Sequence, residues 1–227
     1  MKRGPHYLKH AKCGTLFLKN NEPRFRVQGH IKAVRFYSSG SGGLCDFRSM
    51  KSISSQSAVD FRTVFHALVE QIEQAYFLKV IIGFVTGSYT GQFDGKEIWV
   101  DLDKDPEEAV FILVHLFGHT VQWNVDEKLR VLGLAHSGVT EADLPRIYRY
   151  EREASRLGLA LLEQTSEFRL ARWLTNRFGA DWKFLAHFYR TGEKVRFEVE
   201  TGADEPLLTS IRIPSFVPQR WPPRGSF

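Results

Sequence analysis

Cysteine is scarce in this chain, and long apolar runs are missing from it. Cys13 and Cys45 are the two cysteines among 227 residues, and both precede residue 58, so no disulfide framework is expected. Apolar runs such as residues 109–113 fall far short of the roughly 20 residues that cross a bilayer as a helix. With 43% hydrophobic and 25% charged residues, the composition excludes a fibrous repeat and a wholly disordered chain. The sequence predicts a soluble protein.

Acidic residues are scarce in one part of the chain. Residues 1–57 contain eleven Lys or Arg and two acidic residues, a net charge of +9, whereas residues 58–227 contain twenty and twenty-four, a net charge of −4. The overall charge of +5 therefore belongs to an N-terminal leader. Inferring nucleic-acid binding for the whole protein from that average would be an error.

The leader, residues 1–57, carries two Ser/Gly-rich stretches, at 38–43 and 52–57, and is predicted to be disordered. No apolar segment long enough for a secretory signal follows its first charges. Its basic, Ser-rich composition also resembles an organelle transit peptide, with residues 35–38 resembling a mitochondrial processing site. We expect an ordinary basic tail and a cytoplasmic protein, with the mitochondrial matrix as the alternative if residues 1–37 are a transit peptide.

Apolar periodicity from residue 59 onward predicts an α+β domain over residues 58–199, with helices packed on a small sheet. Asp94-Gly95 between alternating segments indicates a hairpin, and Asp105-Pro106 begins a helix with an N-cap and a proline at N1. The predicted helices are 59–78, 106–124, 145–164, 166–178 and 180–191, with β segments at 80–89, 92–101 and 194–199. Five prolines after residue 205 predict that residues 200–227 form an extended C-terminal tail.

His115 and His119 are four residues apart on a predicted helix, so their side chains share one face. Gly118 and Gln122 lie on that face as well. The helix is apolar nearly all round and should be central to the fold. Two histidines in such an interior must find partners, because burying them unsatisfied is costly.

A third polar group comes from the helix predicted at 145–164. Glu151 shares its face with apolar and small residues such as Ile147 and Gly158, whereas Glu153 points toward Arg149 and Arg156. A carboxylate within an apolar stripe needs a cation or strong donors, while one among arginines needs water alone. Glu151 is therefore the candidate partner of the histidines.

Two helical histidines and a carboxylate from a later helix are the donor set of a tetrahedral zinc site with an open fourth position. Calcium and magnesium prefer more oxygen ligands. The alternative interpretation is that His115 and His119 are satisfied core histidines and Glu151 is part of a buried salt bridge. Gly118, the apolar surroundings of Glu151 and the preceding hairpin favour the zinc interpretation.

Residues 91–162 resemble the ImmA/IrrE group of zinc metallopeptidases within the gluzincin-like class. In that pattern a strand leads into a helix bearing HExxH, often HExGH, and a later helix carries ExxA. His115 and His119 match the two histidines, Gly118 matches the glycine, and Glu151 with Ala154 matches ExxA. The resemblance implies a zincin-like fold, Zn²⁺ held by these three ligands, and a protein or peptide as substrate or partner.

The sequence departs from this pattern after the first histidine, where Leu116 replaces the glutamate that acts as general base. Leucine cannot accept a proton, and general-base catalysis contributes roughly 10²–10⁴-fold. Glu108 lies about 10 Å back along the helix axis, and Glu97 or Asp101 are conceivable substitutes. We expect no catalytic residue at position 116 and weak or absent hydrolysis, as in a pseudoenzyme.

Two other function classes stay open. One is a non-enzymatic protein-binding module on the same fold. The other is a DNA-associated regulator that uses the basic leader and residues 166–192, read as two short helices about Gly179 resembling a helix-turn-helix. An apolar stripe through residues 170–188 favours packing over DNA contact. Lesser candidates, each with a more ordinary packing or surface interpretation, are Tyr148, Tyr150, Tyr189 and His136 as oxyanion-stabilising donors and His187 as a ligand.

Overall fold

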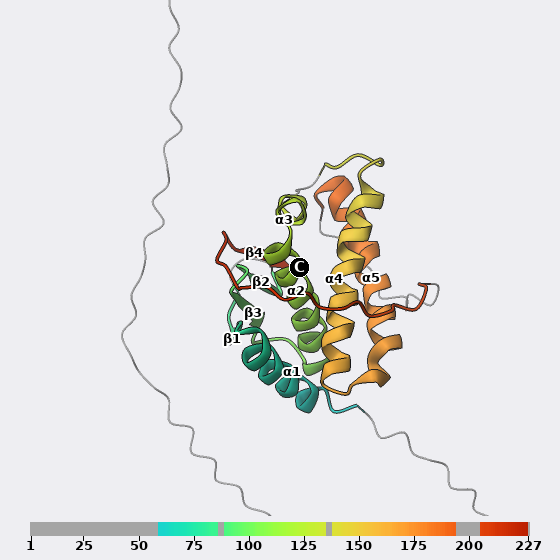
Figure 1. The fold of residues 1–227 in the computed structure, drawn as a ribbon. Helices are drawn as coiled ribbons and strands as arrows, with labels where there is room; N and C mark the ends of the chain where they lie inside the picture. The colour runs from blue at the N-terminus through green and yellow to red at the C-terminus, as the bar shows by residue number, and fades with distance from the viewer. Residues whose placement is uncertain (1–58, 86–88, 135–137, 194–204, 227) are drawn as a thin grey trace, which may run out of the picture. The chain divides into compact units, whose positions relative to one another are not determined.

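The computed structural model describes residues 59–226, apart from the segments 86–88, 135–137 and 194–204. The predicted leader, the predicted strand at 194–199, the start of the predicted tail and His136 lie outside the described residues. Within them the fold is α+β, as expected (Figure 1). The elements are α1 Phe61–Tyr76, β1 Lys79–Gly83, β2 Gly91–Phe93, β3 Glu97–Asp101, α2 Pro106–Val125, α3 Glu127–Gly133, α4 Leu144–Gln164, a 3₁₀ turn Phe168–Leu170, α5 Ala171–Thr191 and β4 Arg224–Ser226.

Local capping determines where the two helices before and after the hairpin begin. Asp60 accepts hydrogen bonds from the backbone N–H groups of Arg62 and Thr63 and starts α1. Asp105 does the same for Glu107 and Glu108 at the start of α2, where Pro106 occupies the first turn. The predicted start of α2 is confirmed.

The sheet has the strand order β1-β3-β2-β4. β1 runs parallel to β3, and β2 and β3 form the predicted antiparallel hairpin. Gly95 has a φ of +86°, a conformation that favours glycine. Asp94 Oδ1 accepts from the N–H groups of Lys96 and Glu97, so the Asp-Gly turn is closed by its own side chain.

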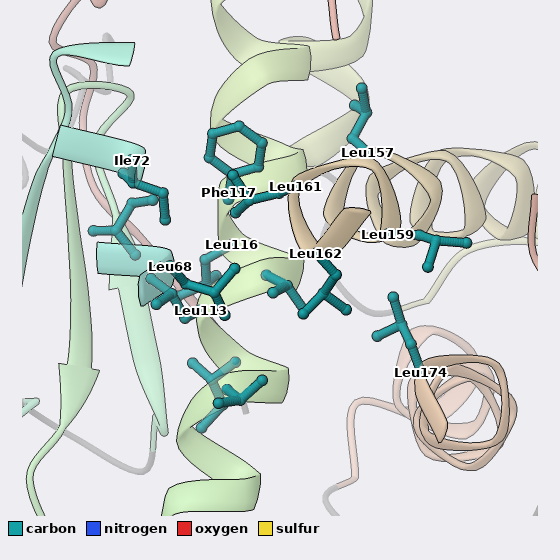
Figure 2. Packing of buried hydrophobic residues seen from close by; sticks show 14 of the residues in the cluster. Leu68, Ile72, Leu113, Leu116, Phe117, Leu157, Leu159, Leu161, Leu162 and Leu174 are labelled. Atoms are coloured by element: carbon teal, nitrogen blue, oxygen red, sulfur yellow. The ribbon is translucent and has the colours of Figure 1, made fainter. Parts of the chain in front are cut away.

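Helix α2 lies at the centre of the fold, buried along most of its length. Figure 2 shows Leu68 and Ile72 of α1 beside Leu113 and Phe117 of α2. Leu162 of α4 belongs to the same cluster of buried residues. A helix covered on several sides must be apolar nearly all round. This explains the composition of α2 and leaves its polar residues to be satisfied inside the protein.

Two glycines let α2 and α4 approach closely. A Cβ added at Gly118 would lie 2.1 Å from the carbonyl oxygen of Ala154, and one added at Gly158 would lie 2.7 Å from that of Val114. Each glycine therefore faces the backbone of the opposite helix. Gly118 is consequently needed for helix packing, and this close contact brings the residues beside it on both helices together.

The predicted pair of helices about Gly179 is wrong. Residues 171–191 form one helix, α5, with Gly179 buried inside it. A glycine costs about 1 kcal/mol in a helix interior, but burial of Phe178, Leu185 and Tyr189 on either side offsets that cost. Without a turn at this position, residues 166–192 do not have the helix-turn-helix arrangement.

Two further elements were not predicted. α3 is a single short helix capped at its N-terminus by Asp126, whose Oδ1 accepts from Lys128 N–H. β4 ends the described chain and pairs antiparallel with β2, with Gly91 opposite Ser226. Between residues 205 and 223 the chain is extended as expected and crosses α4 toward the sheet (Figure 1). Among the described residues, no helix combines the length and apolar character needed to cross a bilayer.

Candidate metal centre

The close contact of α2 and α4 brings together His115, His119 and Glu151. These residues are buried, with 4%, 3% and 1% of their surfaces exposed. Nε2 of His119 lies 3.0 Å from Nε2 of His115 and 2.9 Å from Oε2 of Glu151. Nε2 of His115 lies 3.4 Å from the same carboxylate oxygen. The three residues predicted as ligands therefore converge on one point.

This spacing suits a metal ion. With bonds of about 2.0–2.1 Å, two ligand atoms of a tetrahedral zinc ion lie about 3.3 Å apart. The three separations, 2.9, 3.0 and 3.4 Å, lie within a few tenths of an ångström of that value. The cluster has the composition and size of a three-ligand metal site.

Gln122 determines which nitrogen of His119 carries the proton. Its Nε2 donates to the carbonyl oxygen of Tyr150 at 2.9 Å, so its Oε1 is the atom 2.9 Å from Nδ1 of His119. Nδ1 of His119 must then donate, and in the neutral ring Nε2 carries a lone pair that points toward Glu151. An outer hydrogen bond of this kind orients metal-binding histidines in general.

The charge states of this pair leave two acceptor atoms facing each other. Burial lowers the pKa of His119 to about 4, although Glu151 attracts its proton, so the ring is neutral at pH 7. Burial raises the pKa of Glu151, but its two histidine partners outweigh that effect and hold the pKa well below the ordinary value. A neutral nitrogen lone pair and an ionised carboxylate oxygen 2.9 Å apart require a cation or a shared proton nearby.

His115 supplies that proton in the metal-free protein. Burial lowers the pKa of His115, but the hydrogen bond and charge attraction of Glu151 outweigh it and leave the pKa above the ordinary value. Nε2 of His115 can therefore donate to the two acceptors. A metal ion at the same point would displace this proton, since zinc binds the neutral imidazole.

The second oxygen of Glu151 is held by residues from distant parts of the chain. Tyr189 of α5 donates its hydroxyl proton to Oε1 of Glu151 at 2.8 Å, and Nη2 of Arg224 donates to the Tyr189 oxygen at 2.8 Å. Tyr189 was one of the lesser candidates, but as an oxyanion donor. Arg224 carried no sequence signal, because its position depends on the pairing of β4 with β2.

The cluster opens into a cavity of about 220 Å³. Leu116 lies in its wall, 1% exposed, with its Cδ1 close to Gly91 of β2. Among the described acidic residues, Asp181 of α5 and Glu151 line this cavity. Burial raises the pKa of Asp181 to about 6. The sequence pattern does not point to Asp181, because it predicts that Gly179 interrupts the helix.

None of the acidic residues considered as substitutes for the missing glutamate lines the cavity. Glu108 pairs with Lys104 at 3.0 Å, and Glu97 pairs with Arg220 at 2.6 Å. Asp101 accepts from the N–H of Asp103 at 3.2 Å. These residues have local roles in the fold.

The remaining aromatic and histidine candidates are accounted for by packing. The Tyr150 hydroxyl accepts from Nε1 of Trp123 at 3.0 Å, and its ring stacks on His119. Tyr148 donates to Glu205. His187 lies 4.0 Å from Glu193. Neither Tyr148 nor His187 lines the cavity.

The basic residues of α5 and its preceding turn are partly occupied within the protein. Arg177 pairs with Glu107 at 3.3 Å, and Arg190 pairs with Glu141 at 2.6 Å. Arg169 pairs with Glu167 at 3.0 Å. The segment 166–192, considered for DNA binding, carries five basic residues, Arg169, Arg172, Arg177, Lys183 and Arg190. Three of the five therefore have acidic partners.

The assignment of a candidate metal site consequently depends on the geometry and chemistry of this chain's own residues. A comparison with protein-family models, with curated proteins and with solved structures found no match.

Proposed function

We propose that this chain is a zinc-binding protein of the metallopeptidase type, with His115, His119 and Glu151 as ligands. The observation that carries the proposal is the convergence of two imidazole nitrogens and one carboxylate oxygen, buried and 2.9–3.4 Å apart, at the wall of a cavity. Two nitrogen donors and one oxygen donor suit zinc better than calcium or magnesium. The cavity supplies room for water or a substrate carbonyl at the fourth position.

The pattern of residues supports peptide hydrolysis as the reaction class. The hairpin β2–β3 leads into the helix that carries both histidines, and Glu151 and Ala154 follow on α4, in the order of the ImmA/IrrE-like motif. Zinc in such a site polarises the scissile carbonyl and makes water a better nucleophile. His115, His119 and Glu151 would hold the ion, while Gln122 and Tyr189 orient two of the ligands.

Leu116 favours a second candidate, a protein-binding module that keeps the fold and the metal site but does not hydrolyse. A leucine that is 1% exposed occupies the position at which the motif requires a proton acceptor. In that case zinc stabilises the contact between α2 and α4 and the cavity binds a protein segment. Both candidates require the same ion.

Elemental analysis tests the metal site in both cases. We expect about one zinc per chain in the purified protein after zinc loading and removal of excess metal. Glu151→Ala and His119→Ala should each lose it. Glu153→Ala is the matched control, because Glu153 lies on α4 but outside the buried cluster. A wild-type protein without zinc, or equal zinc in all four proteins, would refute the proposal.

A further inference from the structure

The face of α5 that closes the cavity carries one carboxylate. Asp181, Leu185, Phe188 and Tyr189 all line the cavity, and their spacing of four, seven and eight residues places them on one face of the helix. Tyr189 reaches Oε1 of Glu151 at 2.8 Å. The same face that contacts a metal ligand therefore presents Asp181 to the space beside it.

Asp181 has no direct partner within the part of the chain that the structure describes. No hydrogen bond or ion pair there involves its carboxylate. Arg177, one turn earlier on α5, pairs with Glu107 instead, at 3.3 Å. Besides burial, the charges of His115 and Glu151 in the metal cluster, and then that of Arg177, act on the pKa of Asp181. A half-buried carboxylate without a partner has lost part of its hydration, and such a group is retained most often where it has a function.

We propose that Asp181 of α5 is the proton acceptor of this site. It would take the role of the glutamate that the motif places on α2, where this chain has Leu116. This inference rests on the proposed metallopeptidase function. Among the described acidic residues, Glu151 and Asp181 line the cavity. Glu151 already contacts both histidines. Asp181 is the carboxylate left to act on water there.

The step assigned to Asp181 is a proton transfer in both directions. Its carboxylate accepts a proton from the attacking water as the water oxygen forms a bond to the scissile carbonyl carbon. The resulting carboxylic acid then donates this proton to the leaving amine nitrogen as the C–N bond breaks. One water is consumed, one carboxylic acid and one amine are formed, and Asp181 returns to its starting state. No oxidant or reductant is required.

Acetohydroxamic acid provides a test that does not depend on turnover. This weak acid is protonated at pH 7 but binds zinc as its anion. On binding it therefore loses a proton, which goes either to a nearby base in the site or to the buffer. Calorimetric titration in two buffers of different ionisation enthalpy counts the protons released. The full zinc-loaded chain is used, as wild type, Asp181→Asn and Asp103→Asn. Asp103 is an exposed carboxylate outside the cavity and is the matched control.

We expect wild type and Asp103→Asn to release almost no proton per bound acetohydroxamate, because Asp181 retains it. Asp181→Asn should release about one proton and bind about tenfold more weakly, since a hydrogen bond to a charged group is lost. Asp181→Ala should also release about one proton and bind more weakly. The test can therefore still be made if the asparagine variant fails to fold.

Three outcomes would overturn the assignment. Unchanged proton release and affinity in a zinc-loaded Asp181 variant would show that Asp181 does not take the proton. Weaker zinc binding with unchanged proton release would make Asp181 a positioning residue for His115. A zinc-loaded wild type that does not bind acetohydroxamate would show that the fourth position is closed. If wild type holds no zinc, the proposed function itself fails, and elemental analysis detects this before any titration.

Discussion

Leu116 is the residue at which this chain departs from the HExxH pattern that it resembles. It stands directly after His115, lines the cavity and is almost completely buried. The ligand set around it has the donors of a catalytic zinc centre, including an outer hydrogen bond from His119 to Gln122. A single apolar side chain thus separates this arrangement from the complete HExxH motif, which makes position 116 the most informative one to change.

In a zinc-loaded Asp181→Asn protein, which lacks the proposed base on α5, Leu116→Glu should therefore raise hydrolysis of unstructured peptides by about 10²-fold. The new carboxylate replaces a side chain at the cavity wall, where it can reach water. Release of a fluorophore from quenched peptide substrates measures the rate. Leu113→Glu is the control, since Leu113 is fully buried on α2 and does not line the cavity. We expect that variant to unfold.

A zinc-loaded, folded protein carrying both Leu116→Glu and Asp181→Asn, without a gain in rate over Asp181→Asn alone, would contradict the account at the residue scale. The site would then be distorted in more than one position, and the protein-binding module would be the better description. Zinc content is measured on the same samples, so failure to bind metal is separated from failure to hydrolyse.

At the scale of elements, the site depends on how closely α2 and α4 approach. Two of the proposed ligands come from α2 and the third from α4, so the separation of the helices sets the distance between the histidine nitrogens and the Glu151 oxygen. Gly118 lies on α2 between the two histidine positions and faces the Ala154 backbone. The packing of these helices and the assembly of the ligands are therefore one feature of the fold.

Gly118→Ala should push the two helices apart and disrupt the site. The added Cβ would lie 2.1 Å from a backbone oxygen, which cannot move as a flexible side chain would. We expect a loss of about 3 kcal/mol in unfolding free energy together with loss of stoichiometric zinc. Urea unfolding and elemental analysis measure the two effects.

Gly83→Ala is the matched comparison, because its added Cβ would meet nothing within 4 Å. That variant should retain zinc and change the unfolding free energy by less than about 1 kcal/mol. Equal behaviour of the two variants would mean that the helix contact does not set the site.

At the scale of the whole molecule, the C-terminal strand completes the wall around Glu151. β4 pairs with β2 across more than a hundred residues of sequence and carries Arg224 to Tyr189. Nη2 of Arg224 also lies 3.9 Å from Oε1 of Glu151. Arg224, from the C-terminal end of the described chain, thus lies beside the carboxylate of Glu151.

Arg224→Gln should destabilise the metal-free protein by about 3 kcal/mol, because removing one partner leaves a buried carboxylate less well compensated. Arg220→Gln is the control. Arg220 is 58% exposed and pairs with Asp94 and Glu97, and an ion pair at such a surface contributes about 0–1 kcal/mol. Urea unfolding of both variants without metal measures the difference. Similar losses in the two variants would show that Arg224 contributes no more than a surface charge.

The sequence reveals those features that depend on local spacing. The four-residue interval of His115 and His119, the Asp94-Gly95 turn and the apolar stripe around Glu151 each indicate their structure directly. The continuity of α5 through Gly179, and with it the position of Asp181, depends on burial by other elements. β4 is a three-residue strand, Arg-Gly-Ser, without β-forming residues, so its pairing with β2 and the role of Arg224 follow from tertiary structure alone.

X-ray absorption at the zinc edge of the zinc-loaded protein tests the central claim most directly. The account predicts a four-coordinate ion with two imidazole nitrogens and two oxygen ligands at about 2.0–2.2 Å, from His115, His119, Glu151 and one exchangeable group. The pattern should disappear in Glu151→Ala and persist in Glu153→Ala. A five- or six-coordinate ion surrounded by oxygen, without imidazole scattering, would place zinc on the surface and contradict the three-ligand site.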